Sequence, residues 1–171
     1  MYADLLRQFS KSLRNLDAIL VKATANAESR GFPVDNFIHA RLAPDMLPFW
    51  RQVTIACDGI KAGTAAYSQV EAPKFDDNET TVAQLRERIA KTLAFVDAVP
   101  PEQLGNIQPD QVIKIMFPPG KAMLVRDAAL SRSIPNIYFH LTMAYAILRA
   151  GGVPIGKMDF LGELNMFDAP A

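Results

Sequence analysis

The sequence is poor in the residue types that form covalent or metal cross-links in small proteins. It has one cysteine, Cys57, so neither an internal disulfide nor a multi-cysteine zinc site can form within the chain. It has only two histidines, His39 and His140. Lysine plus arginine and aspartate plus glutamate both number 18, and the lack of excess positive charge argues against nucleic-acid binding or attachment to a membrane surface.

Long apolar runs are also missing. The longest segment without Asp, Glu, Lys or Arg is 133–148, and it is shorter than the roughly 20 residues that span a bilayer. Asp4 stands where a signal peptide would have a basic start. We therefore expect a cytoplasmic protein without a membrane segment, in keeping with its single cysteine. Half of the residues are hydrophobic and 21% are charged, which is enough to form the core of one domain spanning residues 1–171.

Apolar residues recur at steps of three and four along four segments, as is typical of amphipathic helices. In the first segment the stripe comprises Tyr2, Leu6, Phe9, Leu13, Leu16, Leu20 and Ala23. The four predicted helices run from residue 2 to Gly31, from Pro44 to about Tyr67, from Thr81 to Pro100, and from Asp127 to Arg149. Thr81 and Gln84 have the spacing of a capping box at the start of the third helix, and Pro135 is expected to kink the fourth.

Between the third and fourth helices the period changes to two. Residues 112–117 alternate, Pro118-Pro119-Gly120 predicts a turn, and residues 122–125 form a second apolar run, so we expect a small β-hairpin. After the fourth helix, the apolar residues Ile155, Phe160, Leu161, Leu164 and Phe167 indicate that part of the tail packs against the bundle. The predicted fold class is all-α: an antiparallel four-helix bundle with a small β-hairpin before the last helix.

The fourth helix contains the clearest candidate for a functional residue. Arg149 marks its solvent side, and His140, nine residues earlier, lies about half a turn away and should point into the bundle. Asn136 lies one turn before His140 on the same face. We expect the two to line a polar pocket with Asp58 of the second helix, whose carboxylate would orient the imidazole. His39 could reach the mouth of this pocket from a loop.

Ordinary structural roles account for most of the other polar candidates. A lone histidine on an apolar helix face is commonly a hydrogen-bonded core residue. Cys57 has no neighbour in sequence that would lower its pKa and is expected to be a core residue. The acids Asp76, Asp77 and Glu79 are interpreted as a solvated loop and helix start.

Several segments resemble an uncharacterised bacterial branch of the DinB/YfiT-like superfamily. These are PNIYFHLTMAYAILR at 135–149, GVPIGK at 152–157 and DFLG at 159–162, with RLAPDM at 41–46, QV at 52–53 and ACD at 56–58. The resemblance implies a four-helix bundle that is often a homodimer. It also implies a nickel or zinc ion held by one histidine of the second helix and two of the fourth, as in relatives that act as transferases of low-molecular-weight thiols.

The chain departs from that ligand pattern. His140 matches the second histidine of the fourth-helix pair, Asn136 replaces the first, and the second helix offers Asp58 in place of a histidine. One imidazole, one amide and one carboxylate suit zinc or nickel poorly. We therefore expect no cofactor and a small-molecule-binding bundle with a degenerate metal site. The alternative is a divalent-metal-dependent thiol transferase with the metal on His140 and Asp58. In a third interpretation the polar cluster only specifies the packing of the core.

Overall fold

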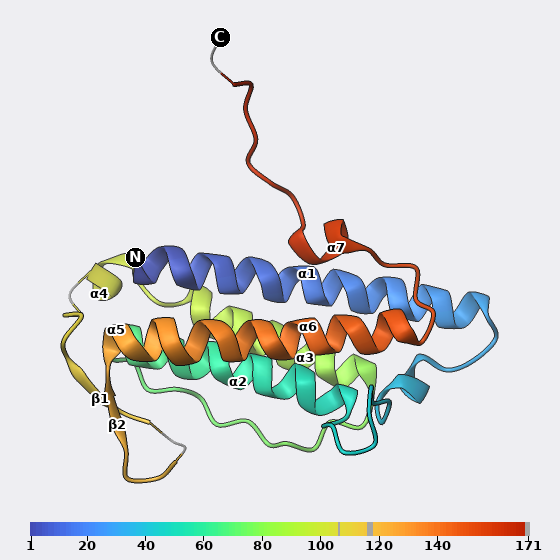
Figure 1. The fold of residues 1–171 in the computed structure, drawn as a ribbon, viewed down its shortest axis with the longest axis horizontal. Helices are drawn as coiled ribbons and strands as arrows, with labels where there is room; N and C mark the ends of the chain where they lie inside the picture. Colours follow the sequence, from blue (N-terminus) through green and yellow to red (C-terminus); the bar gives the residue numbers. More distant parts are fainter. Residues whose placement is uncertain (106, 116–117, 170–171) are drawn as a thin grey trace.

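The computed structural model describes residues 1–105, 107–115 and 118–169. Four long helices lie side by side (Figure 1): α1 (Tyr2–Ser29), α2 (Phe49–Ser68), α3 (Val82–Asp97) and α6 (Ile134–Ala150). α2 packs against both α6 and α3, and α1 packs against α3 and α6. The predicted all-α four-helix bundle with a small β-hairpin is confirmed.

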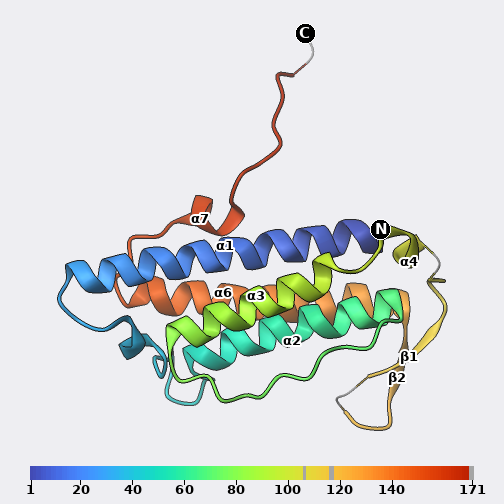
Figure 2. The same cartoon turned by 180° about the vertical axis from the view of Figure 1, so that it is seen from behind.

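The helices form two pairs that run in opposite directions. A long segment, 69–80, follows α2 back along the whole bundle before α3 begins (Figure 2). As a result α2 and α3 run in one direction, while α1 and α6 run in the other (Figure 1). Each contact between the pairs, α1 with α2, α1 with α3 and α2 with α6, therefore joins antiparallel helices.

The apolar stripe of α1 forms one side of the core. All seven residues of the predicted stripe are buried, and Phe9, Leu13, Leu20 and Ala23 are fully enclosed. α1 ends at Ser29, and Gly31 follows with a positive φ of 76°. Only glycine adopts that backbone conformation at little cost, so Gly31 allows the chain to turn away from the helix.

The second helix begins later than its sequence suggests. Its first residue is Phe49, because the preceding residue, Pro48, has an extended backbone with ψ 165°. Leu47, expected on the inner side of the helix, is 44% exposed. The segment before α2 includes the 3-10 helix η1 (Val34–Phe37). The Phe49 N–H donates to the Ala40 carbonyl at 2.9 Å, and this hydrogen bond holds the first turn of α2 to the segment before it.

The third helix begins with the predicted capping box. The Gln84 N–H donates to Thr81 Oγ1 at 3.2 Å, and the Thr81 N–H donates to Gln84 Oε1 at 3.1 Å. The helix ends at Asp97, before Pro100. A short helix that was not predicted, α4 (Pro101–Gly105), follows directly after Pro100.

The predicted hairpin and the last long helix follow in order. β1 (Val112–Lys114) pairs antiparallel with β2 (Ala122–Leu124), while Met116 and Phe117, part of the predicted alternation, lie outside the described residues. Short α5 (Val125–Asp127) then leads through π-helical turns, η2 (Ala128–Ser133), into α6. These wide turns lie directly before Pro135, which has no N–H to donate to the preceding turn.

The tail packs against the bundle only in part. Val153 and Ile155 are buried, and the ring of Phe160 in α7 (Lys157–Leu161) meets Tyr145 edge-on, with 5.9 Å between ring centroids. Leu164 and Phe167 are exposed, so the prediction that part of the tail packs is confirmed, with the packed part ending before them. Figure 1 shows this end of the chain extending away from α1. Within the described ranges, no helix combines the length and hydropathy needed to cross a membrane.

Candidate functional site

His140 points into the bundle, as predicted from the position of Arg149. Its side chain lies on α6 at the contact with α2, and only 8% of the residue is exposed. The ring nitrogen Nδ1 lies 2.8 Å from Oε1 of Gln52, in the first turns of α2. Gln52 itself is 1% exposed. The partner of the buried imidazole is therefore an amide.

The hydrogen bonds around Gln52 place a proton on Nδ1 of the ring. The Gln52 Nε2 group donates to the backbone carbonyl of Leu47 at 2.9 Å. A carbonyl can only accept, so the other end of the amide must be its oxygen, and His140 Nδ1 must carry the proton that this oxygen accepts. In the neutral imidazole the lone pair is then on Nε2.

The surroundings of His140 favour the neutral form. Burial lowers the pKa of the imidazole, and the positive charge of Arg51 lowers it further. Nε2 has no hydrogen-bond partner among the described residues and is not one of their fully buried unpartnered atoms, so it reaches solvent. The ring of Phe139, which is 53% exposed, meets the imidazole edge-on, with 5.2 Å between centroids. The accessible edge of His140 therefore presents a hydrogen-bond acceptor beside an exposed aromatic ring.

Asp58 does not orient His140, contrary to the prediction. Its Oδ1 accepts from Arg88 of α3 at 2.9 Å and pairs with Lys61 at 3.0 Å. Arg88 is 3% exposed, and its guanidinium also binds Glu79 at 2.8 Å and Asp77 at 3.0 Å. The carboxylate of Asp58 is thus directed to α3 because a buried cation there requires it.

The acids before α3 were interpreted as solvated; Asp76 and Asp77 are exposed, but for Glu79, whose side chain is 8% exposed, this is wrong. Asp77 and Glu79 bind Arg88 and so hold the 69–80 segment against the bundle. The Asp76 carbonyl accepts from the same guanidinium at 2.9 Å. The contacts of Arg88 with Asp76, Asp77 and Glu79 therefore have a structural role, because they fix the 69–80 segment to α3.

Asn136 and His39, the other two predicted pocket residues, are both exposed. Asn136 lies at the outer edge of the contact between α2 and α6, where its Nδ2 would be 3.6 Å from a Cβ placed on Gly59. His39 lies in the segment between η1 and α2. An enclosed Asn136–His140–Asp58 cluster is therefore not formed, although Asn136 remains one helical turn from His140 on the same helix.

Cys57 is fully buried, in agreement with its interpretation as a core residue. Burial raises the pKa of its thiol to about 12. The thiol is therefore protonated at neutral pH and lacks the thiolate that nucleophilic attack requires.

The donor set around His140 does not fit zinc or nickel. In the part of the chain that the structure describes, no three His, Cys, Asp or Glu side chains lie close enough to hold one ion. The nearest polar partner of the imidazole is the Gln52 amide, and its oxygen already accepts from Nδ1–H. Tight zinc and nickel sites use several nitrogen or sulfur donors.

The sequence interpretation missed two residues: Gln52, which pairs with His140, and Arg88, which binds Asp58 away from the imidazole. Gln52 could have been found, because it is a polar residue next to Val53 on the buried side of α2. A cavity of about 650 Å³ lies elsewhere, between α1 and the end of α3, and does not include His140.

The four-helix bundle with its hairpin before α6 is a helical bundle of the DinB-like class. A crystal structure of a DinB family member protein from Shewanella denitrificans matches with a TM-score of 0.89 and 43% sequence identity, covering 98% of this chain and 95% of that one. The family described as "Domain of unknown function (DUF1993)" matches residues 1–161, and the chain belongs to it. A search of curated proteins gives no match.

Proposed function

We propose that this protein binds a small molecule through the accessible edge of His140, without a metal ion. The observation that carries the proposal is the hydrogen-bonded series Leu47 carbonyl, Gln52 amide and His140 Nδ1. It holds the imidazole in one tautomer, with the lone pair of Nε2 directed away from the core. A fixed acceptor at the edge of a buried ring is suited to a ligand group that donates a hydrogen bond, such as a hydroxyl or a thiol.

The residues around His140 add to this chemistry. Phe139 offers an exposed ring for the apolar part of a ligand, and Asn136, one turn earlier, offers an amide. Arg51 contributes a positive charge close enough to lower the pKa of His140. These features favour a small polar ligand with an apolar portion. Nothing in them requires proton transfer, so binding is proposed and catalysis is not.

The alternative, a metal-dependent thiol transferase, requires an ion that would lower the pKa of a bound thiol. The donors around His140 favour the metal-free proposal, because Asp58 is engaged by Arg88 and Asn136 offers only an amide.

The test uses nuclear magnetic resonance of the untagged protein with a probe set of small alcohols and thiols. His140→Asn is the discriminating variant, because an asparagine amide can still donate to Gln52 but has no atom in place of Nε2. We expect ring-nitrogen spectra of the free protein to show a neutral imidazole protonated at Nδ1. Probes that bind should shift the Nε2 signal of His140. In His140→Asn, binding of these probes should be lost. An imidazole protonated at Nε2, or binding that survives His140→Asn, would contradict the proposal.

A titration with Zn²⁺ and Ni²⁺ separates the two candidate functions. The proposal predicts no stoichiometric tight binding by the untagged protein. A tightly bound ion that is lost in His140→Asn would instead favour the metal-dependent alternative.

A further inference from the structure

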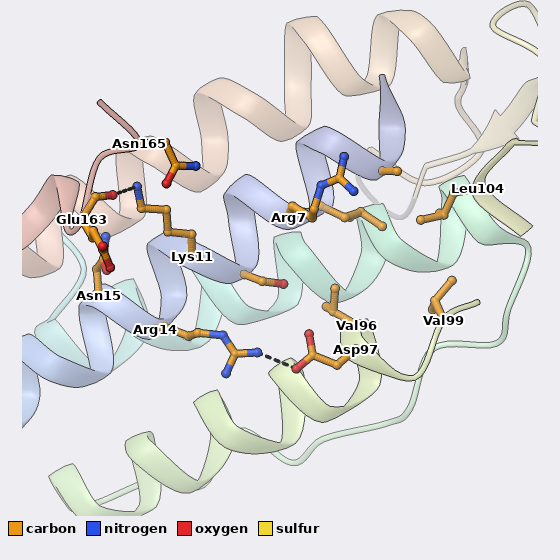
Figure 3. Close-up of a pocket in the computed structure, with 13 residues that line it drawn as sticks. Arg7, Lys11, Arg14, Asn15, Val96, Asp97, Val99, Leu104, Glu163 and Asn165 are labelled. Carbon is orange, nitrogen blue, oxygen red and sulfur yellow. Dashed lines mark hydrogen bonds and ion pairs between the residues drawn. The ribbon is translucent and has the colours of Figure 1, made fainter. Parts of the chain in front are cut away.

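We propose that the groove between α1, the end of α3 and α4 is a second binding site, which takes an amphipathic anion: a short hydrocarbon with one carboxylate or phosphate group. The groove has a volume of about 650 Å³, within the range of small-molecule sites. It is separate from His140, and the proposal does not depend on the function proposed above. Its two walls differ in chemistry, as Figure 3 shows.

One wall is cationic. Arg7, Lys11 and Arg14 follow one another at steps of four and three along α1, and all three line the groove (Figure 3). Like charges at this spacing lie on one face of a helix and repel each other. A bound anion would relieve this repulsion.

The cations differ in how far protein groups neutralise them. Arg7 pairs with Asp4 within α1, and Arg14 pairs with Asp97 of α3 at 2.6 Å. Lys11 contacts the backbone carbonyl of Glu163, which also lines the groove and brings one carboxylate to its rim; among the described residues no ion pair joins Lys11 to a carboxylate. The positive charge of Lys11 is therefore available to a ligand.

The opposite side is apolar. Val96 and Val99 are each 8% exposed, and Leu104 lies beside them (Figure 3), while Leu6 of α1 adds a further apolar lining residue. A hydrocarbon group lying on these residues would bury apolar area on both partners.

Ser10 provides an independent indication of a polar ligand. It lines the groove from α1 and is 7% exposed, and its hydroxyl has no hydrogen-bond partner among the described residues. Buried hydroxyls in proteins almost always have a partner. Ser10 directly precedes Lys11, so a ligand head group held by Lys11 would lie close to this hydroxyl and would become its partner once the side chains that cover the hydroxyl move aside.

The experiment measures binding of octanoate, octyl phosphate and 1-octanol to the whole protein by backbone-amide chemical-shift titration. We expect both anions to shift the amides of Ser10 and Lys11 and of the Val96–Leu104 segment. At least one anion should bind about tenfold more tightly than octanol, as expected for one charge-assisted hydrogen bond. The tighter of the two identifies the head group as carboxylate or phosphate.

Three variants test the residues. Lys11→Gln should weaken anion binding about tenfold, while the matched control Lys91→Gln, on the outer face of α3, should leave it unchanged. Asp97→Asn should strengthen binding, because it frees Arg14. His140→Asn should have no effect, which separates this site from the one proposed above. Equal affinity for octanol and the anions, shifts outside the groove, or the same effect from Lys11→Gln and Lys91→Gln would overturn the proposal.

Discussion

Replacing Gln52 by methionine should expose the role of its amide in holding His140. Methionine has a similar length and an unbranched side chain, so it removes the hydrogen bonds with little change in packing. The His140 Nδ1–H would lose an acceptor at 2.8 Å in a position where Gln52 is 1% exposed. An unpaired buried donor costs about 1–3 kcal/mol. The Leu47 carbonyl adds less, because Leu47 is 44% exposed and water can replace the amide.

We therefore expect Gln52→Met to lower the free energy of unfolding by about 1–3 kcal/mol. For a chain of this size that corresponds to a fall in Tm of roughly 2–12 °C. Urea unfolding at pH 7.5 measures the free energy, and ring-nitrogen spectra measure the tautomer. The imidazole should then populate the form protonated at Nε2, since that proton can reach water. Stability within about 0.5 kcal/mol of the parent, with Nδ1 still protonated, would refute the assignment of Gln52 as the group that sets the tautomer.

Gln52→Glu gives a second, opposite test at the same position. A carboxylate next to the ring favours the imidazolium and should raise the pKa of His140 above its unfolded value of about 6.5. The stabilisation from this pair would be present below pH 6.5 and lost as the pH rises through the raised pKa. The parent protein should instead lose stability as the pH falls, because its His140 pKa is lowered. The free energy of unfolding measured at pH 5.5 and 7.5 therefore distinguishes Gln52→Glu from the parent.

Three further predictions concern pH, capping and packing. Burial and Arg51 lower the pKa of His140, so the stability that His140 contributes above pH 6.5 should fall as the pH drops below that value. The free energy of unfolding should change by at most about 1.4 kcal/mol per pH unit. In urea titrations, His140→Asn should remove this pH dependence. Thr81→Ala removes the acceptor of the Gln84 N–H and should cost about 1 kcal/mol in thermal unfolding, against little change for the matched control Thr81→Ser, which keeps the hydroxyl. Gly151→Ala places a Cβ 2.3 Å from Cε1 of buried Phe37 and should cost about 1–3 kcal/mol by the same assay; an unchanged Tm would show that Phe37 can move.

The long helices could be predicted because each has a local signal. The stripe of α1 repeats over its whole length, and the Thr81–Gln84 capping box marks the start of α3 to the residue. The start of α2 has no such signal. Pro48 is compatible with the first turn of a helix and with the extended residue before it, and the choice depends on contacts of Phe49 with the distant Ala40. Prediction was therefore weakest where long-range hydrogen bonds decide the boundary.

The direction of His140 could be derived from one helix, but its partner could not. Helical periodicity places side chains around an axis and gives no information on how far two helices slide along each other. Asp58 and Gln52 differ by six residues, which is about 9 Å along α2, and only one can meet Nδ1. A carboxylate seemed the better chemical partner for an imidazole, yet buried Arg88 of α3 already binds Asp58. A cation so enclosed requires an acid, whereas a neutral histidine is satisfied by an amide. Because Arg88 of α3 binds Asp58, the α2 side chain that pairs with His140 is Gln52.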